Sequence, residues 1–268
     1  FDSDGFTIGT NGNYNTNNNT YVAWQWKANG GTTSSNTSGN ITTTVQANTT
    51  AGFSIVTWEG ANSTATLGHG LGAVPEMIIS KCIDTTQEWG VYHQALGNDD
   101  YLHLNEDAAE QDNAAYWNDT TPTSTVWSVG NSGPTNDNGD TMLAYVFTPI
   151  QGFSKFGSYT GNGNTDGTFV YLGFKPAFLL LKKYNTTADF QMRDNQRDSF
   201  NDDTSQILFA DINDVEASST NNIADFLSNG FKLRGTGGDH NGNNDTFVYM
   251  AFAEHPFVSS KGVPVTAR

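Results

Sequence analysis

Acidic side chains in glycine- and asparagine-rich segments are the residues of this sequence best suited to ion chemistry. Asp137 and Asp140 lie in one such segment, and Asp239 and Asp245 lie in another. Carboxylate oxygens in turns are ligands that calcium prefers, so these four residues are candidate calcium ligands, although their spacing is not that of an EF-hand. The alternative is that each aspartate bonds to the backbone of its own turn, which is the commoner role of Asp in such segments.

Catalytic patterns are the next chemistry to consider, and the sequence marks none. No pair of carboxylates is set apart by its context, as a glycosidase would require. Ser54 and Ser154 lack the Gly-x-Ser-x-Gly elbow of a nucleophilic serine. No glycine loop follows a strand and opens a helix, as phosphate binding needs. We therefore predict a protein that is not an enzyme, has no catalytic residues and needs no cofactor, with calcium as the one candidate ion.

Aromatic residues make up 12% of the chain and suggest ligand binding, because an exposed ring can stack on the face of a sugar. Trp58, Tyr92, Trp117 and Tyr159 lie near the ends of predicted strands or in loops, where a ring could face solvent. Arg193 takes the place of Tyr92 in the second copy of the internal repeat. Two copies of one scaffold with different exposed chemistry indicate a binding scaffold, so these five are the candidate ligand-binding residues.

An internal repeat must position these residues. Segments about 100 residues apart match over most of the chain, a period that indicates a repeated structural unit. The matching segments are Gly52-Phe53-Ser54 with Gly152-Phe153-Ser154, residues 140–147 with 245–252, and, for a partial third copy, residues 1–6 with 226–231 and 20–27 with 246–253. The predicted organisation is a partial repeat with its last two strands and a linker at 1–38, a first full repeat at 39–150, and a second full repeat with a C-terminal tail at 151–268. The absence of an initial Met fits a piece of a longer polypeptide.

Apolar residues within each copy alternate with a period of two, which is the period of a β-strand. One face of the closing strand of each copy carries only large apolar side chains, so it is a predicted core face. These side chains are Val22, Trp24 and Trp26, then Leu143, Tyr145 and Phe147, then Val248, Met250 and Phe252. With about seven strands per copy, the sequence predicts an all-β chain of tandem, jelly-roll-like antiparallel β-sandwich repeats of about 100 residues each.

Charge and cysteine content exclude several classes of protein. The formal net charge is -16, from 12 Lys and Arg against 28 Asp and Glu, which opposes binding to nucleic acid or to an anionic bilayer. No apolar run approaches the about 20 residues that span a membrane, so no membrane insertion is expected. A single cysteine, Cys82, cannot form an internal disulfide.

Several phrases of the sequence resemble the C-terminal repeats of tail-fibre-like proteins from marine and cyanobacterial bacteriophages. They are Gly52-Phe53-Ser54-Ile55-Val56-Thr57-Trp58, Gly68-His69-Gly70-Leu71-Gly72-Ala73-Val74-Pro75, Trp89-Gly90-Val91-Tyr92-His93 and Phe226-Leu227-Ser228-Asn229-Gly230-Phe231-Lys232-Leu233. The resemblance covers nearly the whole chain, including its last residues, 263–268. It implies an extracellular protein on the virion surface, in the tail or a fibre, and supplies no catalytic residues.

From this resemblance we expect a distal tail fibre or receptor-binding protein that recognises a glycan or an outer-membrane protein of the host cell. A homo-oligomer is expected, with a trimer as one form, and other virion proteins are expected partners. Two alternatives stay open. A capsid decoration or purely structural fibre protein would use the same fold without a ligand, and a polysaccharide-degrading tailspike enzyme would need an acidic pair in a cleft.

Overall fold

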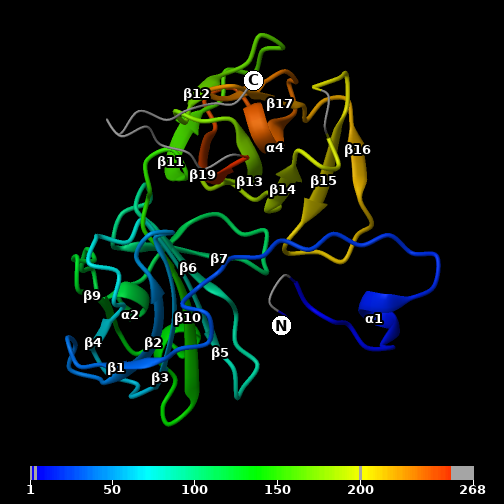
Figure 1. The fold of residues 1–268 in the computed structure, drawn as a ribbon. Helices are drawn as coiled ribbons and strands as arrows, with labels where there is room; N and C mark the ends of the chain where they lie inside the picture. The colour runs from blue at the N-terminus through cyan, green and yellow to red at the C-terminus, as the bar shows by residue number, and fades with distance from the viewer. Residues whose placement is uncertain (1, 3–4, 199–200, 255–268) are drawn as a thin grey trace.

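The computed structural model describes residues 2, 5–198 and 201–254 and consists almost entirely of antiparallel β-sheet (Figure 1). Two sandwich units follow one another along the chain, each with one large and one small sheet. The predicted all-β sandwich class is therefore confirmed. No helix among the described residues is long and apolar enough to cross a membrane.

The large sheet of the first unit has the strand order β1-β2-β3-β10-β5-β6-β7-β8. A small sheet of two strands, with two short helices, covers its outer face. The elements are β1 (Ser34–Asn36), β2 (Thr43–Asn48), β3 (Phe53–Glu59), β4 (Ala65–Gly68), β5 (Met77–Cys82), β6 (Gly90–His93), β7 (Asp100–His103), β8 (Gln111–Asp112), α2 (Ala114–Trp117), β9 (Val126–Val129), α3 (Gly133–Asn136) and β10 (Thr141–Phe147). Strands β4 and β9 form the small sheet.

The large sheet of the second unit runs β11-β19-β13-β14-β15-β16, which resembles the β3-β10-β5-β6-β7-β8 part of the first large sheet, and its small sheet has three strands, β12-β18-β17. Its elements are β11 (Ser154–Thr160), β12 (Phe169–Tyr171), β13 (Pro176–Lys183), β14 (Gln191–Asp194), β15 (Ser205–Phe209), β16 (Ala217–Ser219), β17 (Ala224–Leu227), β18 (Gly230–Leu233), α4 (Gly238–Asn241) and β19 (Thr246–Ala253). Closing strands β10 and β19 hold corresponding central places, between β3 and β5 and between β11 and β13.

Three apolar clusters hold the molecule together. One lies between the sheets of the first unit, and another lies between the sheets of the second unit. The third lies between the two units, where the inner faces of the two large sheets meet. It includes Phe53, Met77 and Phe147 from the first unit and Phe178 and Phe252 from the second. The predicted core face of the closing strands therefore packs against the neighbouring unit, because the opposite face of each strand already fills the core of its own unit.

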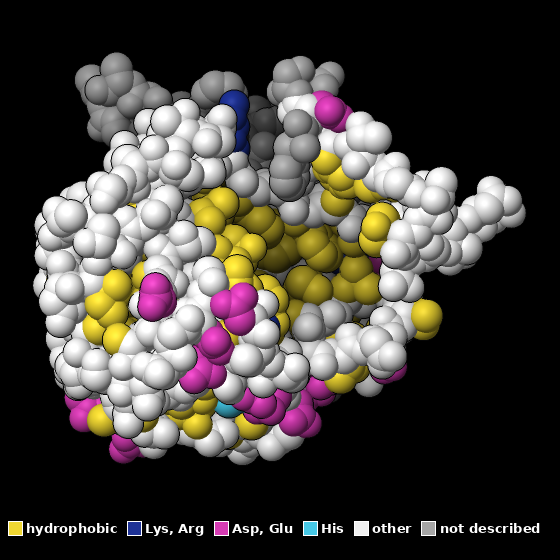
Figure 2. Space-filling model, turned by 90° about the horizontal axis from the view of Figure 1, so that it is seen from below, with side chains coloured by type: hydrophobic (Ala, Val, Ile, Leu, Met, Phe, Trp, Pro, Cys, Tyr) yellow, Lys and Arg dark blue, Asp and Glu magenta, His cyan; other side chains and the backbone are white. Residues whose placement is uncertain are grey.

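The segment before β1 differs from the prediction. Its described residues contain one short helix, α1 (Gly12–Asn15), and no strand, although residues 20–27 carry the alternation of a closing strand. A strand needs neighbouring backbone to pair with. The place between β3 and β5 is filled by β10, and the place between β11 and β13 is filled by β19, so neither is open to residues 20–27. Trp24 and Trp26 nevertheless pack against the cluster between the units. We call residues 5–28 the arm. The view of the molecule in Figure 2 shows hydrophobic side chains gathered in a hollow of its surface.

A buried asparagine connects several loops in both units. Asn136, at the end of α3, accepts a hydrogen bond from Ala61 N and donates to Ser63 O and Gly130 O. Asn241, at the end of α4, makes the equivalent contacts with Asn162 N, Asn164 O and Gly235 O. In the arm, Asn15 ends α1 and donates to Gly9 O, again six residues before it. We call the set of hydrogen bonds that Asn136 or Asn241 makes to the surrounding loops the asparagine bridge. Asn15 makes only one bond of this set, so the arm has the local structure of α3 and α4 without the loops that surround them.

Candidate functional site

The five predicted ligand-binding residues all lie inside the protein, which corrects the prediction of an aromatic site made from them. Trp58, Tyr92 and Trp117 belong to the core of the first unit, and Tyr159 belongs to the core of the second. Their exposed fractions are between 2% and 8%, and Arg193 is 1% exposed. A ring that solvent does not reach cannot stack on a glycan. Trp58 packs on Trp127 and Tyr159 packs on Phe231 of the small sheets, while Tyr92 packs on Trp117 of α2.

Arg193 has a structural place on β14. Its Nη2 atom donates to Gln191 Oε1 at 2.7 Å and to Asn222 O at 2.9 Å. Burial lowers the pKa of its guanidinium to about 10, because the charged form loses its hydration. The neighbouring Tyr159 stacks on Phe247 with 4.9 Å between ring centroids, and burial raises the pKa of its hydroxyl. Neither group is available to a ligand in solution.

Two aromatic rings that were not predicted do face solvent. Phe169 and Tyr171 alternate along β12 with the buried Val170 and are 43% and 58% exposed. They stand on the outer face of the small sheet of the second unit. Strand β4 of the small sheet in the first unit, Ala65–Gly68, carries no aromatic residue.

Charged groups surround these two rings. Lys155 Nζ lies 5.5 Å from the centroid of Tyr171 and donates to Tyr171 O at 2.7 Å. Lys232 is the cross-strand partner of Phe169 and pairs with Asp166 at 2.8 Å. The hydrogen bond from Lys232 lowers the pKa of the Asp166 carboxyl. We call Lys155, Asp166, Phe169, Tyr171 and Lys232 the β12 face; it offers stacking surface together with hydrogen-bond donors and acceptors.

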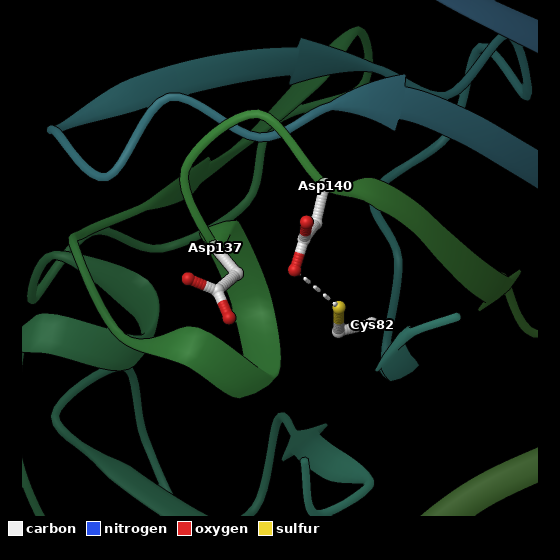
Figure 3. Close-up of side chains that lie close together, drawn as sticks. All are labelled: Cys82, Asp137 and Asp140. Carbon is white, nitrogen blue, oxygen red and sulfur yellow. Dashed lines mark hydrogen bonds between the residues drawn. The ribbon is translucent and has the colours of Figure 1, made fainter. Parts of the chain in front are cut away.

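Two of the predicted calcium ligands meet in the first unit (Figure 3). Asp137 follows α3, Asp140 precedes β10, and Cys82 ends β5; one ligand atom from each lies within 4.8 Å of the others. The Cys82 thiol donates to Asp140 Oδ2 at 3.4 Å, and Thr85 Oγ1 lies 3.1 Å from the same oxygen. Gln87 Nε2 donates to Asp137 Oδ2 at 3.0 Å. Calcium takes six to eight oxygen ligands, so a set that includes a thiol fits calcium poorly.

The corresponding carboxylates of the second unit have a cation from the chain itself. Lys183 occupies the position on β13 that Cys82 occupies on β5, since the two pair with the equivalent residues Phe247 and Met142. Its Nζ atom lies 3.5 Å from Asp239 Oδ1 and 3.9 Å from Asp245 Oδ2. The lysine ammonium supplies the positive charge at this site, so the predicted calcium pair of the second unit is an ion pair within the protein.

The fold and these surfaces define an all-β protein of two packed sandwich units with solvent-exposed rings on one outer sheet. A family model described as a domain of unknown function (DUF7483) matches residues 1–256. The chain belongs to this family. No curated protein and no solved structure shows a significant match to the chain.

Proposed function

We propose that this protein is a bacteriophage virion surface protein, a tail-fibre or receptor-binding protein, and that its β12 face binds a glycan of the host cell surface. The observation that carries the proposal is the pair of exposed rings, Phe169 and Tyr171, on an outer sheet. The resemblance of the repeated phrases to phage tail-fibre-like repeats supports the virion location.

The chemistry of the β12 face suits a sugar better than an apolar ligand. An aromatic ring offers its face to the C–H groups of a pyranose, while sugar hydroxyls need donors and acceptors at the edge. Lys232 and Asp166 lie beside Phe169 and supply both, and Lys155 lies beside Tyr171. The rings lie on a sheet surface, which supports binding without turnover.

The test is binding of the intact chain to a panel of purified lipopolysaccharides and capsular polysaccharides, followed by competition for phage adsorption. The double variant Phe169→Ala, Tyr171→Ala loses two stacking contacts of about 1 kcal/mol each, so a fall in affinity of about 30-fold is expected. The matched control is Ile83→Ala, which removes a side chain that is 54% exposed on the first unit. Unchanged affinity in the double variant, an equal loss in the control, or no binding to any glycan would contradict the proposal. Release of reducing ends would favour the tailspike alternative.

A further inference from the structure

An apolar groove of about 450 Å³ lies between the arm and the two units. Figure 2 shows the hollow with hydrophobic side chains on its walls. It is lined by Trp24, Trp26, Phe53, Phe153, Phe178 and Phe252. All of these also belong to, or pack against, the cluster that joins the two units. The groove is therefore continuous with an existing interface between sandwich units, which indicates the kind of surface that it is suited to receive.

Three equivalent residues meet beside this groove, which two of them, Trp26 and Phe252, line. Trp26, Phe147 and Phe252 occupy the same position in the three closing-strand sequences, at residues 20–27, in β10 and in β19. Their ring centroids are 6.4 Å apart for Trp26 and Phe147, 5.5 Å for Trp26 and Phe252, and 6.1 Å for Phe147 and Phe252. All three pairs are edge-to-face. Equivalent residues that meet pairwise at similar distances are the arrangement expected around a threefold axis.

A second contact repeats in the same sense around this point. His93, the last residue of β6, donates from Nε2 to Tyr249 O on the closing strand of the second unit, at 3.1 Å. Asp194, the last residue of β14, accepts from Trp24 Nε1 in the closing-strand sequence of the arm, at 3.2 Å. The last residue of the β6-type strand thus contacts the next closing-strand sequence in both cases, although the contacted residues lie one position apart in the repeat, since Tyr249 corresponds to Ala23. Head-to-tail contacts of this kind generate a closed ring when the rotation closes.

We propose that the groove is the seat of a third sandwich unit of this fold, one that lacks its own closing strand and takes residues 20–27 as that strand. The three large sheets then surround an axis that passes between the rings of Trp26, Phe147 and Phe252. The third unit's counterpart of β6 and β14 reaches β10 near Tyr145, the position equivalent to Trp24. That contact is the third of the ring.

The arm is already prepared for this role. Residues 20–27 form no strand pairing with any described residue, whereas β10 and β19 are paired on both sides. Asn15 makes the bond to Gly9 O that Asn136 makes to Gly130 O. A third unit supplies the loop amide and carbonyl that complete this asparagine bridge.

The experiment adds the strands of the proposed third unit to the whole chain. A second copy of residues 151–225 is joined ahead of Phe1, because the sequence from Phe1 onward parallels the sequence from Phe226 onward. The parent chain is expected to bind the dye anilinonaphthalene sulfonate in the groove, and the fusion is expected to reduce the dye fluorescence at least about fivefold. The fusion should also resist proteolysis as one body. The matched control is the same fusion with Trp24→Ser and Trp26→Ser, in which dye binding and proteolysis of the added unit should persist.

A second readout depends on the asparagine bridge. Asn15→Ala is expected to leave the unfolding midpoint of the parent chain unchanged and to lower that of the fusion, whereas Asn136→Ala is expected to lower both. A second fusion, with residues 39–121 ahead of Phe1, guards against misfolding of one added copy. The proposal is overturned if the parent does not bind the dye, or if both fusions leave dye binding unchanged and release the added segment on mild proteolysis.

Discussion

The asparagine bridge of the first unit allows a quantitative test of the local architecture. Replacing Asn136 with alanine removes hydrogen bonds of 2.9 Å to Ala61 N, 2.7 Å to Ser63 O and 2.9 Å to Gly130 O. Each buried backbone group left without a partner costs about 1 kcal/mol or more. Ala61 and Ser63 are exposed residues, so water can partly replace their lost hydrogen bonds. We therefore expect Asn136→Ala to lower the free energy of unfolding by about 2 to 3 kcal/mol.

The chain supplies its own controls for this measurement. Asn241→Ala should cost as much, since Asn241 makes the same three contacts in the second unit. Asn15→Ala should cost less than about 0.5 kcal/mol, because Asn15 is exposed. The assay is urea unfolding followed by tryptophan fluorescence, with the slope compared as well as the midpoint. A loss below about 1 kcal/mol for Asn136→Ala, or an equal loss for Asn15→Ala, would refute the reasoning.

Three further predictions concern charge and the contact between units. Cys82→Lys should place an ammonium beside Asp140, as Lys183 does in the second unit, and calorimetry should show a melting temperature that is kept in low salt and falls in 1 M NaCl; loss of folding in low salt would count against it. Burial lowers the pKa of His93 to about 4, so between pH 6.5 and pH 4 the unfolded chain binds more protons than the folded chain. The free energy of unfolding should therefore decrease as the pH is lowered through this range. His93→Gln should reduce that slope in urea unfolding at several pH values without abolishing it, because burial also lowers the pKa of His240 and His69, and an unchanged slope would exclude a contribution from His93. Residues 39–150 alone should bind anilinonaphthalene sulfonate and self-associate, since their inner sheet face loses its cover; a monomer without dye binding in light scattering would contradict this.

Alternation in the sequence predicted one apolar face of the closing strands and left the other unrecognised. Tyr145 and Phe147 were placed on a core face, and the structure packs them against the neighbouring unit. The opposite side of β10, with Met142, Ala144 and Val146, is fully buried inside the first unit. A period of two shows that a strand has two faces, but smaller residues on one of them do not show whether a second layer covers it.

The burial of the candidate site residues could not be predicted from the sequence for a similar reason. Trp58 and Tyr92 were predicted at exposed strand ends, yet Trp117 of α2 covers Tyr92 and the small sheet of the first unit covers Trp58. That sheet exists because β4 pairs with β9, about sixty residues later, and such distant pairing leaves no local signal. Phe169 and Tyr171 share a face by alternation, but alternation alone does not decide which face of a strand meets water.

The two head-to-tail contacts are made from the same position at the end of β6 and β14, but by different side chains, His93 and Asp194. Each contact therefore requires a different hydrogen-bonding partner. Ala95 N donates to Nδ1 of His93, so Nε2 carries the proton that is donated to Tyr249 O. Asp194 can only accept, and it does so from the indole N–H of Trp24 while Arg197 pairs with the same carboxylate oxygen at 2.7 Å. A carboxylate at position 93 would face the Tyr249 carbonyl with two acceptors opposed, which is a repulsive arrangement. The side chain at the end of each β6-type strand therefore matches the hydrogen-bonding group that it meets, a carbonyl for His93 and an indole N–H for Asp194.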